Sequence, residues 1–294
     1  MTRKKGEDIQ EELKKLEDNL KLKYATTNDK NNWIGKIFES NKCGSFIVID
    51  VIKKNKDGST NYLCKFINTG YLVNIHKSNI KTGSVTDRYY PIVYNVGIIG
   101  DIGSISVNKY PYYGLWRYML HRSYNEEYKN KYPTYKDVIV CDEWLTLTNF
   151  SKDVSNIIGY KQMIEHGYKY KFNLDKDIIL HNNKIYNLNN CCLIPEKLNS
   201  FFINKQITNT TGYEGVGLHN GKIRARVNRD NKSIFIGHFS DPLDAYNEYH
   251  KNKKEILDYY LNNEFNFIDN FIKEKMYIKL QNQYDETLNK EKCL

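Results

Sequence analysis

The sequence predicts an α+β, multidomain fold. At 294 residues the chain is too long for one small domain, so two or three domains are expected. Segments with apolar residues at helical spacing alternate with groups of short strands, which are separated by turns rich in Gly, Asn and Asp. In chain order we expect an N-terminal helix, a small β-barrel, a hairpin-helix module with a helical cover, a three-stranded sheet with its own helix, and a helical tail.

Composition and charge narrow the classes of function. The formal net charge is +9 and the sequence pI is near 9.0, which favours a polyanionic partner, most simply nucleic acid. None of the six cysteines belongs to a C-x-x-C pair, which argues against a zinc site. The amino terminus holds no apolar signal region, and no apolar run approaches the length of a membrane span. We therefore expect a soluble protein of a reducing compartment, without a membrane partner.

The first two segments predict a helix and a barrel. Residues 1–30 are predicted to form a charged helix and a linker, and one apolar stripe runs along the helix through Ile9, Leu13, Leu16 and Leu20. This stripe suits packing on the body of the protein or self-association in a short coiled coil. Residues 31–105 contain five alternating segments, which predict the strands of a small barrel: 35–40, 45–54, 60–68, 71–80 and 84–93.

Residues 106–207 begin with a helical segment. Trp116 and Met119 recur on one apolar face of this helix, whereas Arg117 and Arg122 lie on the other face. The two arginines are therefore candidates for contacting DNA. The alternative is that they are simply solvated, because isolated surface charges are common.

A hairpin followed by a helix ends this region. We predict a strand at 173–180, a polar turn at 181–184, a second short strand at 191–194, and a helix that starts after Pro195. Strand, loop, strand and helix in this order are the minimal frame of a one-metal nuclease site, in which a divalent cation lies beside a general base. The alternative is an ordinary hairpin whose asparagines serve the turn.

These residues resemble the HNH motif. The run at 187–194, followed by Asn199, is similar to the second half of that motif in phage-encoded HNH homing endonucleases. The resemblance implies that Asp175 and Asn199 hold one Mg²⁺ or Mn²⁺ ion, and that a water activated beside it attacks the phosphate. It also implies that Asn190 orients the general base.

The chain departs from the family at the general base itself. The family has a His there, which accepts a water proton near pH 7, and this chain has Lys176. An ordinary lysine is protonated at that pH and cannot act as a base unless burial lowers its pKa by several units. A lysine ammonium could instead stand in for the cation. His181, five residues beyond Lys176, is the alternative base.

Residues 208–260 predict a sheet suited to DNA. Three strands, with a tight Asn-Gly turn between the first two, precede a helix that begins at Pro242. Strand alternation puts Arg224, Arg226 and Asn228 on one face of the middle strand, and apolar side chains on the face toward the helix. One face is therefore predicted to meet a partner and the other to form a core.

The same unit resembles the ethylene-response-factor, or APETALA, type of DNA-binding domain, and the segments that carry the resemblance are 215–216, 222–227, 236–239 and 244–246. A twisted sheet of this kind can enter the major groove, where arginine reads guanine with two hydrogen bonds. Lys222, Arg229 and Lys232 would then hold phosphates. The family usually has an aromatic residue near Lys222, and this chain has none there. The alternative is a basic sheet that serves only solubility.

Residues 261–294 predict an amphipathic helical tail, which would extend the last domain or pack on another subunit. Together the segments predict a double-stranded DNA-binding protein related to HNH homing endonucleases, with a nuclease site impaired by Lys176. The implied setting is the cytoplasm of a bacterial host during phage infection. Two alternatives stay open: an active metal-dependent endonuclease that nicks or cleaves DNA, and a phage protein that binds and inhibits a host protein.

Overall fold

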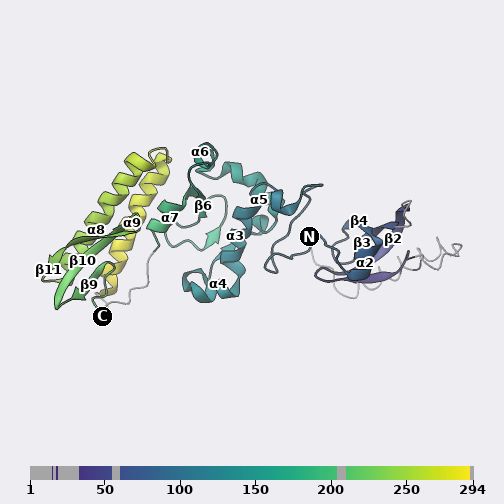
Figure 1. The fold of residues 1–294 in the computed structure, drawn as a ribbon, viewed down its shortest axis with the longest axis horizontal. Helices are drawn as coiled ribbons and strands as arrows, with labels where there is room; N and C mark the ends of the chain where they lie inside the picture. The colour runs from purple at the N-terminus through teal and green to yellow at the C-terminus, as the bar shows by residue number, and fades with distance from the viewer. Residues whose placement is uncertain (1–14, 16–17, 19–32, 55–59, 204–209, 292–294) are drawn as a thin grey trace. The chain divides into compact units, whose positions relative to one another are not determined.

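The computed structural model describes residues 33–54, 60–203 and 210–291, together with Lys15 and Asp18 (Figure 1). These residues confirm the α+β class and form two compact units. One unit comprises Met1–Asn125 and Asp142–Phe150, and the other comprises Glu126–Cys141 and Ser151–Leu294. The five-part division predicted from the sequence stays a prediction. The predicted N-terminal helix lies almost entirely outside the described residues.

The first unit contains an antiparallel sheet whose four strands follow one another in chain order: β1 (Ile37–Ser40), β2 (Gly44–Lys54), β3 (Thr60–Phe66) and β4 (Leu72–His76). Phe46 and Phe66 from adjacent strands are fully buried in its core. Within the described residues β1 and β4 do not pair, so the sheet is not closed. The prediction of a barrel is therefore wrong, although four of its five strands are present.

Turn and cap chemistry explains why the predicted barrel is not completed. After β4 the chain forms a short helix, α2 (Lys77–Thr82), because the His76 side chain caps the amide of Ser78 and Gly83 ends the helix at φ 67°. The predicted fifth strand is irregular. There the buried Asp87 carboxylate accepts hydrogen bonds from the Tyr89 amide and from the Thr69 hydroxyl, which fixes a turn.

Short helices complete the first unit, among them η1 (Val107–Lys109), α3 (Tyr113–Tyr124), η3 (Asp142–Leu145) and the start of α5 (Leu147–Asp153). The predicted apolar face of α3 is confirmed, since Trp116 and Met119 are fully buried. The indole Nε1 of Trp116 donates to the carbonyl oxygen of Trp144 at 2.8 Å, which satisfies the one polar atom of that ring.

The second unit opens with small elements: α4 (Glu126–Lys131), η2 (Pro133–Tyr135), β5 (Ile139–Val140), η4 (Val154–Asn156) and α6 (Tyr160–His166). The predicted hairpin and helix follow as β6 (Phe172–Asp175), β8 (Cys192–Pro195) and α7 (Glu196–Phe201). β6 and β8 pair antiparallel, and β7 (Ile185–Tyr186) in the loop between them pairs parallel with β5. The first strand ends at Asp175 instead of continuing to residue 180.

The three-stranded sheet has the predicted form. Its order is β11 (Lys232–Phe239), β10 (Lys222–Arg229) and β9 (Val216–His219), all antiparallel. Asn220 and Gly221 both have positive φ, as a tight hairpin turn requires. α8 (Pro242–Tyr259) then packs on the sheet (Figure 1), and the Asp241 carboxylate caps its first amides.

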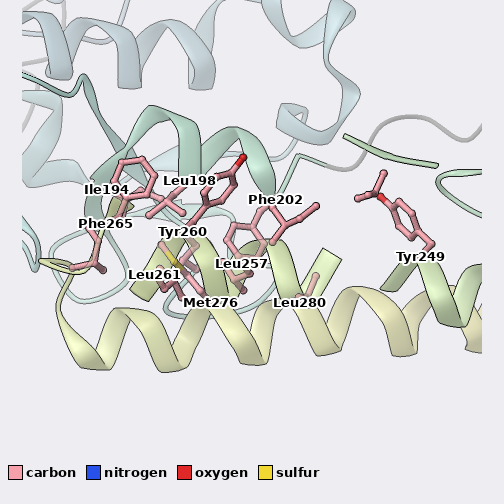
Figure 2. Close-up of a cluster of buried hydrophobic side chains, with 14 of the residues drawn as sticks. Ile194, Leu198, Phe202, Tyr249, Leu257, Tyr260, Leu261, Phe265, Met276 and Leu280 are labelled. Carbon is pink, nitrogen blue, oxygen red and sulfur yellow. The ribbon is translucent and has the colours of Figure 1, made fainter. Parts of the chain in front are cut away.

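The helical tail belongs to the core of the second unit. α9 (Asn270–Glu291) follows the short segment η5 (Tyr260–Glu264), and its buried Met276 and Leu280 join a cluster that also holds Leu198 of α7 and Leu257 of α8. Figure 2 shows these side chains together. Side chains of the hairpin module and of the three-stranded sheet therefore contribute to one buried cluster.

Candidate nucleic-acid interface and hairpin site

The two faces of β10 differ in what they contact. Ala225 and Val227 are buried in the core on the side of α8, as strand alternation predicts. Arg224 and Arg226 alternate with them and so point to the other side of the sheet, which we call the outer face. Lys222 and Asn228 share this face and are exposed. The structure thus brings together four of the predicted DNA-binding residues.

An aromatic residue that sequence reasoning missed also lies on the outer face. Arg226 lies opposite Phe235, whereas Ala225 lies opposite Gly237, so Ile236 is an extra residue that makes a bulge in β11. Residues opposite each other share a face, which puts Phe235 beside Arg226 and His238 beside Arg224. Phe235 is 52% exposed, and its ring centroid lies 5.1 Å from that of His238. The alternation of KSIFIGHF alone does not reveal this arrangement.

The remaining predicted DNA contacts lie elsewhere. Lys232 is exposed at the start of β11. Arg229 points to the helix side, where its guanidinium lies 3.9 Å from the ring centroid of Tyr259. Arg117 is exposed in the first unit, but Arg122 is only 4% exposed and its guanidinium lies against the Tyr118 ring. Arg122 is therefore buried in the core of the first unit.

In the hairpin, Asp175 ends β6 as a buried cap. Its Oδ1 accepts hydrogen bonds from the amides of Asp177 and Ile178, both at 2.8 Å. This Asx-type turn is the reason that the strand stops here and that Ile178 turns into the core. Burial raises the pKa of the Asp175 carboxyl above its ordinary value, and the neighbouring charge of Asp177 adds to the rise.

Two lysines neutralise Asp177. Lys176 donates to its Oδ2 at 2.9 Å, and Lys279 of α9 donates to its Oδ1. Burial acts to raise the pKa of Asp177, but the two ammonium groups outweigh burial and lower it to about 2. Sequence reasoning missed Lys279, because it lies about a hundred residues away. The available signal was a lysine within the apolar stripe of the tail, next to Leu280.

Two of the other predicted site residues, Asn190 and His181, belong to separate hydrogen-bond networks. Asn190 donates to the side-chain oxygen of Asn183, and Asn183 in turn donates to the main-chain oxygen of Lys176 at 2.7 Å. His181 is paired instead with Glu286 of α9, at 2.7 Å from Nε2. Asn199 lies half-buried on α7. Asn190 thus supports the backbone at Lys176, while His181 binds the tail.

The residues at this site do not fit a Mg²⁺ or Mn²⁺ ion. Such an ion takes about six oxygen ligands, usually with one or more carboxylates free to bind it. Here Asp175 uses Oδ1 on two amides, and both oxygens of Asp177 accept from ammonium groups. Among the described residues there is also no group of three or more His, Cys, Asp and Glu side chains arranged to hold a metal.

Comparisons with known proteins add no assignment: no family model, curated protein or solved structure matches this chain. In the part of the chain that the structure describes, none of the helices combines the length and the apolar character needed to cross a membrane.

Proposed function

We propose that this protein binds double-stranded DNA through the outer face of the β9–β11 sheet. The observation that carries the proposal is the arrangement of Arg224 and Arg226 beside Phe235 on one open sheet face, opposite a face that α8 covers. On this proposal the unit acts as an ethylene-response-factor-type domain, and the setting is a phage-infected bacterial cell.

The chemistry of this face suits a duplex. The segment 216–239 has five basic residues and one acidic residue, whereas the other acidic residues of residues 208–260 lie on α8 and in the loops. Arg224 and Arg226 have the planar donor pairs that recognise guanine edges, and Lys222 and Lys232 are exposed near the ends of their strands, where they can hold phosphates. Phe235 supplies an apolar surface of the kind that contacts thymine methyl groups.

Cleavage is not part of the proposal. A general base needs a free lone pair, and Lys176 donates its hydrogen bond to Asp177. The hairpin, α7 and α9 share one core with the sheet, so the module that resembles HNH nucleases is proposed to act as the scaffold of the DNA-binding face.

A gel-shift experiment with a matched pair of variants tests the proposal. The double variant Arg224→Ala, Arg226→Ala is expected to lose DNA binding by roughly ten-fold or more, because each arginine contributes about 1–3 kcal/mol. Lys254→Ala is the control, since Lys254 is exposed on α8, away from the outer face. Equal binding by the two variants would overturn the proposed face.

A plasmid assay with Mg²⁺ or Mn²⁺ in the same tubes separates binding from cleavage. We expect shifted but intact plasmid. Nicking by the wild type that disappears in Asp175→Ala would replace the scaffold role with the endonuclease alternative. If no DNA binding is detected at low salt, the remaining hypothesis is that the protein binds a protein partner.

A further inference from the structure

The hairpin site contains an unusual concentration of buried charge. Asp175, Lys176 and Lys279 are all less than 9% exposed, and Asp177 joins them. Three of these residues follow one another in the chain, whereas Lys279 comes from α9. The site is therefore assembled from two distant segments and exists only when α9 is in place.

The Lys279 ammonium lies in the field of both carboxylates. It donates to Asp177. Burial acts to lower the pKa of Lys279, but the charges of Asp175 and Asp177 outweigh burial and raise it. Two carboxylates in a water-poor site repel each other, and each loses hydration. A positive charge beside them offsets both costs. In a metal site that charge is a divalent ion, and here it is an amine.

Further contacts of α9 hold Lys279 in register. One turn and two turns beyond it, Gln283 donates to the carbonyl oxygen of Phe202 at 2.9 Å, and Glu286 accepts from His181 and Asn182. The buried Met276 and Leu280 flank Lys279 on the same side of the helix. α9 is thus bound to the hairpin by polar contacts along the length that carries the lysine.

We propose that the Lys279 ammonium takes the place of a divalent cation in this carboxylate site, so that the hairpin is stabilised by the protein's own C-terminal helix and not by a metal. The proposal does not depend on DNA binding. Its consequence is that the native protein binds no divalent ion here, and that removing the amine while keeping the carboxylates creates a place for one.

Thermal unfolding of two matched variants tests this. Lys279→Met keeps the aliphatic stem and removes the charge, and Lys275→Met makes the same change one turn earlier, at a more exposed position. Removing the Lys279 charge from this cluster of carboxylates is expected to lower the Tm of Lys279→Met by roughly 10 °C. Lys275→Met is expected to stay within about 2 °C of the wild type.

The effect of metal gives the decisive readout. Millimolar Mn²⁺ is expected to raise the Tm of Lys279→Met by several degrees and to leave the wild type unchanged, with EDTA reversing the rise. Adding the substitution Asp177→Asn to Lys279→Met should abolish the rise in Tm caused by Mn²⁺. Mn²⁺ titration followed by electron paramagnetic resonance should show one saturable site in Lys279→Met alone.

Three results would overturn the proposal: saturable Mn²⁺ binding by the wild type that requires Asp175, equal Tm values for the two methionine variants, or a destabilised Lys279→Met that Mn²⁺ does not restore. If Lys279→Met does not fold, Lys279→Arg serves instead. This variant keeps the charge, so it should fold without metal and show no Mn²⁺ response, and a Mn²⁺ response would contradict the proposal.

Discussion

Arg226 lies directly opposite Phe235 across the β10–β11 pair, while the preceding residue, Ala225, lies opposite Gly237. The one-residue bulge between these pairs turns an aromatic ring to the side of the arginines and leaves Ile236 toward the core. The proposed DNA-binding face therefore combines donors for base edges with an apolar surface, although the sequence spaces them nine residues apart.

The first prediction concerns that ring. Phe235→Ala is expected to weaken duplex binding by about 1 kcal/mol, roughly five-fold, because about half of the ring remains to be buried by a partner. Stability should change little, since the ring is half exposed. Fluorescence anisotropy with a labelled duplex measures the affinity, and Phe235→Trp is the control expected to keep it. Unchanged affinity in Phe235→Ala would remove the ring from the interface.

The second prediction separates base contacts from phosphate contacts. Arg226→Lys keeps the charge but loses the planar donor pair, so it should reduce the preference for a selected duplex over an unrelated one. Lys232→Ala should weaken binding to both duplexes about equally and lower the salt dependence by about one charge. Competition binding with the two duplexes distinguishes these patterns. If Lys232→Ala instead reduced the preference and Arg226→Lys weakened binding to both duplexes equally, Lys232 would be the base contact and Arg226 the phosphate contact.

The third prediction uses two glycines with positive φ. A Cβ atom on Gly215 would overlap the Tyr249 ring and lie 2.8 Å from the main-chain oxygen of Arg226, whereas a Cβ on Gly221 meets nothing within 4 Å. Both alanine variants carry the cost of a left-handed backbone, about 1–2 kcal/mol. Gly215→Ala should be destabilised further and lose DNA binding, because the helix-to-sheet packing is disturbed. Equal stabilities of the Gly215→Ala and Gly221→Ala variants in urea unfolding would contradict this packing.

Asp177 gives a prediction for pH. Its folded-state pKa, about 2, lies below the ordinary value of 3.8, so its ionised form stabilises the fold above pH 3.8. This contribution, on the order of 1–2 kcal/mol, is lost as the pH falls from 3.8 toward 2. The stability difference between wild type and Asp177→Asn should therefore shrink over this window. Urea unfolding at several pH values measures it, and a constant difference would show that the pairing with Lys176 and Lys279 is not formed.

Individual strands and helices were predictable where the hydrophobic periodicity was accompanied by residues that start or end such an element. The middle strand with Ala225 and Val227 inward, and the helix that begins at Pro242, are both present as predicted. In these segments the hydrophobic period and the turn chemistry indicate the same structure. The apolar face of α3 follows for the same reason.

The barrel and the site assembly were not predictable in this way. Asp87 fixes a turn and Asp175 ends β6, because each buried carboxylate accepts hydrogen bonds from nearby amides. An aspartate in the sequence does not show whether it will be buried. Lys279 reaches Asp177 only through the packing of α9. Its place in the apolar stripe of the tail indicates a buried lysine but does not identify Asp177 as its partner. The bulge at Ile236 likewise depends on pairing between strands.

The central claim is tested most directly by the salt dependence of duplex binding. Several Lys and Arg contacts to phosphate release counterions, so the affinity of the wild-type chain should fall at least ten-fold between about 50 and 200 mM NaCl. The double variant Arg224→Ala, Arg226→Ala should show weaker binding and a smaller slope. Binding that does not change with salt, or that is the same in the variant, would contradict recognition of DNA by the outer face of the β9–β11 sheet.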